Sequence, residues 1–284
     1  MERLRAPNER TGGLIMKILR KIHRMFKLHR IFIKQDLKKL MEYKVDFLTG
    51  AIGMLLNQAV NLFFLSVIFS QIPSLNGWKF EEILFIYGFS LLPKAIDHLF
   101  FDNLWAIGYF IIRKGDFDRY LTRPVSSLFA VTVEKFQVDA FGELVVGIAL
   151  LCVSIPKLTL SFSVINILLF IAAVFFATFI YTGVKLITSS IAFWTKRSGS
   201  ITYMFYMVND FAKYPTTIYN RFIRGIITYI IPFAFTAFYP ASYFIRGGSA
   251  LFCIGGTVLM ATVLMAVGIL VWNLGVRAYE SAGS

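Results

Sequence analysis

Long apolar runs alternate with short polar stretches along most of the chain. Val45–Phe69, Val164–Trp194 and Ala250–Trp272 each exceed the roughly 18 apolar residues that are typical of a membrane-spanning helix. Two further segments, Ile83–Ile112 and Leu144–Ile155, are also largely apolar. This pattern predicts an all-α, polytopic membrane protein.

Composition supports the same fold class. Of 284 residues, 57% are hydrophobic, 17% are aromatic and only 16% are charged, whereas a soluble domain averages about a quarter charged. A large soluble all-helical protein would have little use for so much apolar surface. We therefore exclude that class.

An amphipathic helix is predicted before the first span, over Leu14–Tyr43. It suits the membrane interface, because lysine and arginine side chains can reach the lipid headgroups. Its apolar face carries Ile15, Ile18, Leu19, Ile22 and Phe26. The expected organisation is a leader (1–13), an interfacial elbow helix (14–44), a six-span domain (45–275) and a cytoplasmic tail (276–284).

Basic residues give the orientation. Residues 1–44 hold 13 of the 29 Lys and Arg residues, and the net charge of the chain is +13. Because this excess adjoins the first span, it indicates contact with anionic lipids rather than with nucleic acid. Arg113–Arg123 and Lys196–Arg197 are also basic, so the positive-inside rule places them and both termini in the cytoplasm.

Polar residues lie inside several apolar segments. Asn57 and Asn61 share one face of the first span, and Asn209 lies in a later one. They are expected either to form interhelical hydrogen bonds or to line a substrate path.

The second span carries several ionisable residues: Lys94, Asp97, His98 and Asp102. Lys94 neighbours both Asp97 and His98 on a helix. This spacing is compatible with a structural ion pair and equally with a role in transport.

No arrangement of residues indicates an enzyme. The chain has three histidines, no metal motif and no phosphate-binding loop. A hydrolase built on Asp97 and His98 is disfavoured, because adjacent helical residues point about 100° apart. Cys152 and Cys253 lie in apolar runs and are expected to be structural.

The topology of residues 201–248 has two interpretations. In the first, Ile201–Phe211 and its flanks form the fifth span, and Ile226–Ile245 forms a re-entrant outer hairpin broken at Pro232 and Pro240. In the second, Ile201–Arg224 stays cytoplasmic and Ile226–Ile245 is the fifth span, which satisfies the charge rule better. Both give six spans.

The most informative loop joins the second and third segments. Gly115 and Pro124 bound a predicted helix of one or two turns. Phe117, Tyr120 and Leu121 are expected to act there as apolar contacts for a soluble partner, although a solvated connection explains the charges equally well. The residues assigned to this loop are Gly115, Asp116, Phe117, Asp118, Arg119, Tyr120, Leu121, Arg123 and Pro124.

The ordered set of segments resembles the type-2 ABC transporter permeases, in particular a bacterial subgroup whose substrates are mostly unassigned. The resemblance covers about residues 30–275 and no single motif is diagnostic. It is carried by YKVDFLTG, IIRKGDFDRYLTRPVSSLF, FWTKRSGS and IIPFAFTAFYPASYF.

This resemblance implies a dimeric permease, paired with the same or an unlike chain, and two copies of a separate ATPase that holds ATP and magnesium. It implies that Gly115–Pro124 is the coupling helix that contacts the ATPase. It also favours the first topology, with Pro232 and Pro240 in an outer gate, in a bacterial inner membrane. Arg221, Arg224 and Arg246 then lie near the outer surface, against the charge rule.

The sequence therefore predicts a non-catalytic permease subunit of an ATP-driven exporter that works by alternating access. A secondary transporter that uses Lys94, Asp97, His98 and Asp210 as an ion relay stays open. So does a non-transporting receptor or immunity protein. The substrate cannot be identified from these residues.

Overall fold

The computed structural model describes residues 16, 27–35, 37–38, 44–161 and 163–281. The chain is 80% helical, and its described part contains no strand. Within that described part, five segments are long and apolar enough to cross a membrane. They are built on α2 (Lys44–Gln71), α3 (Phe80–Phe101), α7 (Phe141–Ser154), α8 (Val164–Ser190) and α13 (Gly256–Ala278).

Shorter helices and single turns connect these five. The α-helices are α4 (Leu104–Ala106), α5 (Asp118–Leu121), α6 (Ser127–Val133), α9 (Ala192–Thr195), α10 (Gly199–Met207), α11 (Arg221–Gly225) and α12 (Phe238–Arg246). The π-helical turns are η1 (Ile107–Ile111), η6 (Ile226–Ile230) and η8 (Leu251–Gly255). The 3-10 turns are η2 (Val138–Ala140), η3 (Ile155–Lys157), η4 (Val208–Lys213), η5 (Thr216–Ile218) and η7 (Phe233–Phe235).

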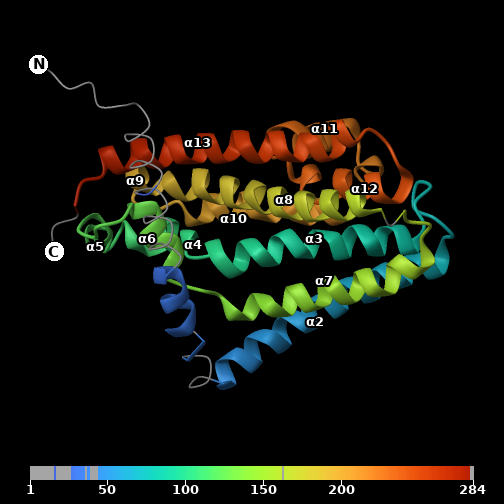
Figure 1. Cartoon of the computed structure of the whole chain (residues 1–284), viewed down its shortest axis with the longest axis horizontal. Helices are drawn as coiled ribbons and strands as arrows, with labels where there is room; N and C mark the ends of the chain where they lie inside the picture. Colours follow the sequence, from blue (N-terminus) through green and yellow to red (C-terminus); the bar gives the residue numbers. More distant parts are fainter. Residues whose placement is uncertain (1–15, 17–26, 36, 39–43, 162, 282–284) are drawn as a thin grey trace, which may run out of the picture.

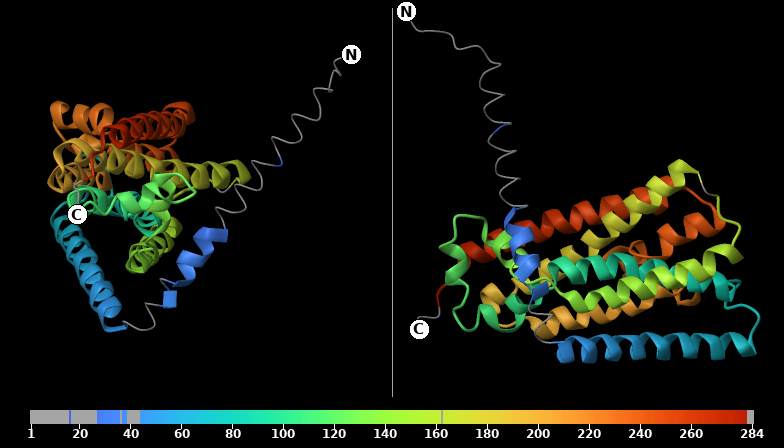
Figure 2. Two further views of the ribbon diagram at one scale, coloured as in Figure 1. Left: turned by 90° about the vertical axis from the view of Figure 1, so that its left-hand side faces the viewer. Right: turned by 60° about the horizontal axis from the view of Figure 1, so that its bottom comes forward.

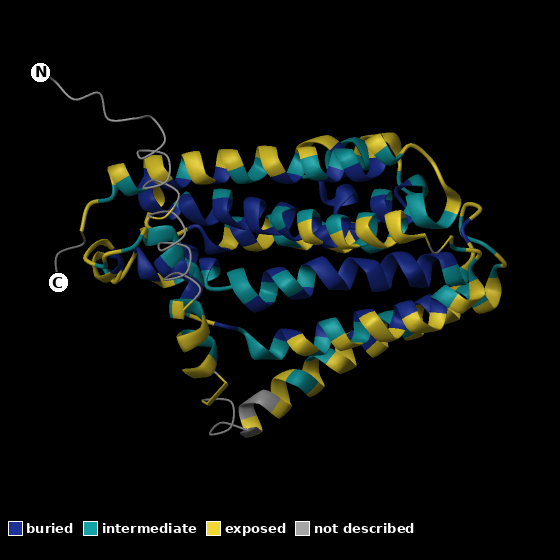
Figure 3. Cartoon of the chain, viewed as in Figure 1, coloured by how far each residue is buried: buried dark blue, intermediate teal, exposed yellow. Residues whose placement is uncertain are grey.

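The long helices lie side by side, with α3 inside the bundle and α2 at its edge (Figures 1 and 2). In the most apolar stretch of α3, 78% of the residues are buried, against 11% in α2. Figure 3 shows the same contrast between a dark α3 and a largely yellow α2. The bundle therefore buries α3 on nearly all sides and leaves most of α2 uncovered by this chain.

Glycines allow α3 and α7 to approach closely. A Cβ atom on Gly88 would lie 3.1 Å from the carbonyl oxygen of Gly147, and one on Gly147 would lie 3.1 Å from that of Gly88. Small residues at helix contacts are a common device in membranes, where packing replaces the hydrophobic effect. The pair holds α7 against one side of α3.

The predicted second span is shorter than expected. The sequence pattern placed it over Ile83–Ile112, but α3 ends at Phe101. Asp102 and Asn103 interrupt it because their side chains bond elsewhere: Asp102 accepts from Gln137 at 3.2 Å, and Asn103 donates to the Val131 carbonyl at 2.7 Å.

Residues 199–246 run the length of the bundle and then stay at its far end. Before α10, the Ser198 amide donates to the Gly108 carbonyl at 2.9 Å. Within η5, the Thr217 carbonyl accepts at 2.7 Å from Asn76, which lies in the α2–α3 connection. Arg246 then pairs with Glu82, at the start of α3, at 2.7 Å. Figure 1 shows α11 and α12 at this same end.

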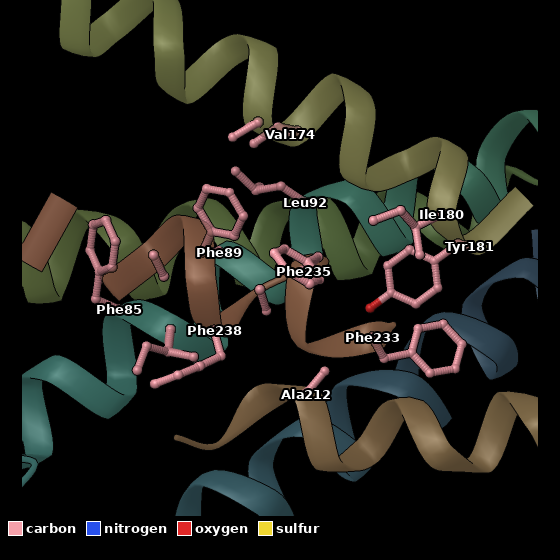
Figure 4. Packing of buried hydrophobic residues seen from close by; sticks show 14 of the residues in the cluster. Phe85, Phe89, Leu92, Val174, Ile180, Tyr181, Ala212, Phe233, Phe235 and Phe238 are labelled. Atoms are coloured by element: carbon pink, nitrogen blue, oxygen red, sulfur yellow. The ribbon is translucent and has the colours of Figure 1, made fainter. Parts of the chain in front are cut away.

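The segment between α11 and α12 is packed into the core. Phe233, Phe235 and Phe238 are at most 5% exposed, and Figure 4 shows them among side chains of α3 and α8. Pro232 and Pro240, the expected gate residues, are both buried, but only Pro232 lies in this segment; Pro240 lies in the first turn of α12 and does not break that helix. This irregular backbone is therefore covered by protein, as backbone at membrane depth requires.

A helix at residues 27–35 lies across one end of the bundle (Figures 1 and 2). Leu28, His29, Phe32 and Ile33 are half-buried, and the His29 ring lies 5.6 Å from that of Phe100 in α3. This is part of the interfacial helix predicted over Leu14–Tyr43. The predicted leader and the apolar face from Ile15 to Phe26 lie outside the described residues.

Candidate functional site

A small polar cavity lies between α2, α3 and η4. Its volume is about 150 Å³, and its walls include Asn57, Asn61 and Asn209. The structure thus brings together the three asparagines that the sequence singled out for a substrate path. The remaining lining residues are Gln58, Tyr87, Ser90, Leu91, Lys94, Asp210 and Lys213.

Hydrogen bonds fix the amides of this cavity. Asn61 donates to the side-chain oxygen of Asn57 at 3.0 Å. The Tyr87 hydroxyl donates to Gln58, and the Tyr181 hydroxyl donates to Asn209. The bond from α8 to Asn209 ties η4 to the bundle core. Both interpretations of the asparagines are therefore compatible with the geometry, since bonded amides still face a shared cavity.

Two lysines bring positive charge to the cavity wall. Lys213 pairs with Asp210 at 3.1 Å. Lys94 pairs with Glu143 of α7 at 3.1 Å, and that carboxylate is 5% exposed. Each cation in the cavity therefore already has a counter-ion.

Glu143 also contacts a second basic side chain, that of His98. His98 lies between two carboxylates, with its Nδ1 3.5 Å from Glu143 and its Nε2 3.7 Å from Asp102. Lys185 of α8 is 3.3 Å from Asp102 and 2.7 Å from Asp97. A chain of charged side chains thus links the polar cavity to α8.

These ion pairs join different helices. The sequence spacing placed Lys94 beside Asp97 and His98 on α3, but Lys94 bonds to α7 and Asp97 bonds to α8. Helical spacing alone cannot show which neighbouring helix supplies a closer partner, and a buried charge is costly unless it finds one. The charges of α3 are therefore shared with both neighbouring helices.

Lys185 was missed by the sequence analysis. It is 2% exposed and contacts two carboxylates. The available signal was a single charge inside the apolar run Val164–Trp194, since an ionisable residue in a span calls for a partner. Among the described residues, no group of His, Cys, Asp or Glu is arranged to hold a metal ion.

The loop between Gly115 and Pro124 contains the expected short helix as α5. Gly115 has a φ of 77°, which ends the preceding helix at a residue without a side chain. Phe117 and Tyr120 are buried, at 0% and 1% exposure. Phe117 packs on the rings of Phe193 and Trp272, at 5.0 and 5.8 Å.

Only one of the three apolar residues expected to contact a partner is exposed. Leu121 is 47% exposed, whereas the rings of Phe117 and Tyr120 fix α5 to the bundle. The loop surface is polar around it, with Arg113, Lys114, Asp116, Asp118, Arg119, Thr122 and Pro124 all exposed.

Charge pairs hold the loop in shape. Glu134 pairs with Arg119 at 2.7 Å and with Arg123 at 3.2 Å. Burial and the nearby charge of Glu134 raise the pKa of Tyr120, so its phenol stays neutral. The loop is thus a rigid, charged projection of the bundle.

A family model described as "ABC-2 family transporter protein" matches residues 55–283. Searches of curated proteins and of solved structures gave no match.

Proposed function

The chain belongs to the ABC-2 family of transporter proteins, and on that premise we propose that it is the permease subunit of an ATP-driven exporter. Family membership identifies a membrane transport subunit of an ABC transporter and implies association with an ABC ATPase. The proposed ATPase is a separate chain, present in two copies, that binds ATP and magnesium. The permease itself is proposed to catalyse nothing.

The α5 loop is the proposed contact with the ATPase. This proposal is supported by the fact that some side chains of the loop are buried in the bundle and others are exposed. Its aromatic rings are buried in the bundle, whereas Asp116, Arg119 and Leu121 are exposed. A force on the exposed side chains would therefore reach α9 and α13 through Phe117, which packs on Phe193 and Trp272. Only the exposed residues of the loop can contact a partner.

Six membrane crossings are proposed, one more than the five long helices. The path from Ser198, beside Gly108, to Thr217, beside Asn76, supports a crossing made of α10 and the 3-10 turns after it. The return of Arg246 to Glu82 supports the re-entrant outer hairpin with Pro232 and Pro240 as gate residues. The prolines and 3-10 turns explain why no long helix marks these segments.

A second permease is proposed to cover α2. Asn57 is exposed halfway along this apolar helix; its side-chain oxygen accepts from Asn61, but lipid would offer no acceptor to its amide N–H groups. A partner, either a copy of this chain or an unlike one, would cover that face. The polar cavity beside Asn57 would then lie next to the interface and line the substrate path during alternating access.

Both ends of the described chain lie at the α5 end of the bundle (Figure 1). With the basic loops placed inside, this end is proposed to be cytoplasmic, in a bacterial inner membrane. The described basic residues of the interfacial helix would then face anionic lipids.

The first experiment is affinity purification of the tagged chain in mild detergent, followed by mass spectrometry. We expect an ABC ATPase to co-purify with the wild type and to be lost with Asp116→Arg/Leu121→Asp, which changes only exposed loop residues. Lys157→Glu, an exposed charge change at the other end of the bundle, serves as the control.

Retention of the ATPase by the loop variant would refute the assigned contact. In reconstituted vesicles, transport that follows a proton gradient and ignores ATP would instead establish a secondary transporter. The chain of Lys94, the buried Glu143 and His98 is the feature that favours this second candidate.

A further inference from the structure

A second, larger cavity lies on the other side of α3. Its volume is about 770 Å³, and it is bounded by the helix at residues 27–35, α3, α6 and α8. Aromatic and aliphatic side chains form almost all of its wall. Those used below are Leu92, Phe100, Phe129, Val174, Phe175 and Phe179.

The few polar groups in the wall, with one exception, donate to backbone carbonyls of their own helices. The Thr132 hydroxyl donates to the carbonyls of Leu128 and Phe129, and the Thr178 hydroxyl donates to that of Val174 at 3.0 Å. A buried water needs two to four polar partners, and the cavity does not provide them. Its occupant must therefore be apolar along most of its length.

The cavity is open towards the surrounding membrane. Phe175 and Ile171 line it and are 55% and 59% exposed, so they lie at its outer rim. From Phe170 to Phe179, the α8 wall extends about 14 Å along the helix axis. An elongated apolar group could enter from the side of the bundle without unfolding any helix.

The exception among the polar groups lies at the interfacial end. The Nδ1 atom of His29 is buried and has no hydrogen-bond partner among the described residues. The same helix exposes Lys27, Arg30 and Lys34. Basic residues beside a membrane surface attract anionic headgroups, so the exposed face of this helix complements a negative charge beside the cavity.

We propose that this cavity binds one acyl chain of an anionic phospholipid, with the headgroup against the helix at residues 27–35. The acyl chain fills the apolar space between α3 and α8. The phosphate lies against the exposed basic face of that helix, formed by Lys27, Arg30 and Lys34, while His29, on the opposite face, borders the acyl chain. The bound lipid joins the interfacial helix to the bundle, and its binding does not depend on transport.

The test uses the full chain purified in detergent and mixed with phosphatidylglycerol or phosphatidylcholine, followed by native mass spectrometry. We expect the wild type to retain one phosphatidylglycerol. Val174→Trp, which places an indole in the cavity, should lose it. Ile167→Trp, on the exposed surface of α8 outside the cavity, should retain it.

A variant of the basic residues separates the contribution of the headgroup charge to lipid binding from that of the acyl chain. Arg30→Gln/Lys34→Gln should abolish the preference for phosphatidylglycerol over phosphatidylcholine, whereas Lys157→Gln should preserve it. Equal retention by Val174→Trp and wild type would overturn the proposal. So would retention of detergent alone, or of both lipids equally by the wild type.

A measurement on the wild type covers the case in which Val174→Trp does not fold. With isotope-labelled histidine, phosphatidylglycerol nanodiscs should shift the His29 ring signals relative to phosphatidylcholine nanodiscs, while the His98 signals serve as an internal reference. Identical His29 signals in both would overturn the preference of the cavity for the anionic lipid. Since no ATPase is present in these experiments, their failure would leave the proposed export function untouched, and loss of ATPase binding would leave this proposal untouched.

Discussion

The two sides of α3 border cavities of opposite character. Tyr87, Ser90 and Lys94 line a polar cavity of about 150 Å³. Leu92 and Phe100 line an apolar cavity of about 770 Å³. The polar cavity is small and its side chains bond to one another, whereas the apolar cavity is large and its wall makes few polar contacts.

This difference has an energetic consequence. Around the polar cavity, each group depends on a specific partner, and loss of that partner leaves a buried charge or amide unsatisfied. Around the apolar cavity, side chains interact by non-directional packing. Removing a polar group there leaves no buried partner without a hydrogen bond. Substitutions on the polar side should therefore be far more costly, which the following changes test in order of decreasing effect.

Lys185→Met should be the most destabilising of these changes. It removes the cation 2.7 Å from Asp97 and 3.3 Å from Asp102, and both carboxylates stay inside the bundle. Breaking a buried ion pair by removing one partner costs about 3–5 kcal/mol. The melting temperature of the detergent-purified protein should fall strongly.

The controls for Lys185→Met are a double variant and a surface variant. Asp97→Asn/Lys185→Met removes the nearer carboxylate charge as well and should recover part of the loss. Lys157→Met, at an exposed lysine, should melt like the wild type. If Lys185→Met melted like the wild type too, the charged chain would not stabilise the bundle, and the contrast between the two sides of α3 would fail.

Asn209→Leu should have an intermediate effect. It removes the acceptor of the buried Tyr181 hydroxyl, and an unsatisfied buried polar group costs about 1–3 kcal/mol. It also places an apolar side chain in the polar cavity, so ATP-dependent transport should fall beyond what the loss of folded protein explains. Thermal melting and a transport assay in vesicles separate the two effects.

The matched change for Asn209→Leu is the double variant Tyr181→Phe/Asn209→Leu. It removes both partners, and the Thr236 hydroxyl still donates to the Phe233 carbonyl at 2.7 Å. Stability should return most of the way while transport stays low. Recovery of transport together with stability would show that Asn209 holds the fold and does not line a substrate path.

The same contrast explains what could be predicted from the sequence. Asn57, Asn61 and Asn209 could be singled out because a polar residue in an apolar span is conspicuous. Leu92, Phe100 and Val174 could not, because an apolar residue looks the same whether it packs against a helix, lines a cavity or faces lipid. The apolar cavity is thus a property of the fold alone.

The positions of the helices could be predicted from the sequence, but the contacts between them could not. The five apolar segments could be located from hydrophobic length, and the short helix α5 from Gly115 and Pro124. The partner of a charged residue on another helix could not be located from the sequence, as the pairing of Lys94 with Glu143 shows. The exposure of the α5 side chains also depends on the fold, because Phe117 is buried by Trp272, more than 150 residues later.

Thr178→Val should have the smallest effect, although Thr178 is 1% exposed. It lines the apolar cavity, and its hydroxyl donates only to the Val174 carbonyl of its own helix. That carbonyl remains the acceptor of the ordinary helical hydrogen bond four residues on, so no buried group is left unsatisfied. The expected change in the free energy of unfolding is below about 1 kcal/mol. A melting temperature lowered as far as in Asn209→Leu would show that a hydroxyl on this side has a partner as important as those on the polar side, and the two sides of α3 would no longer differ in kind.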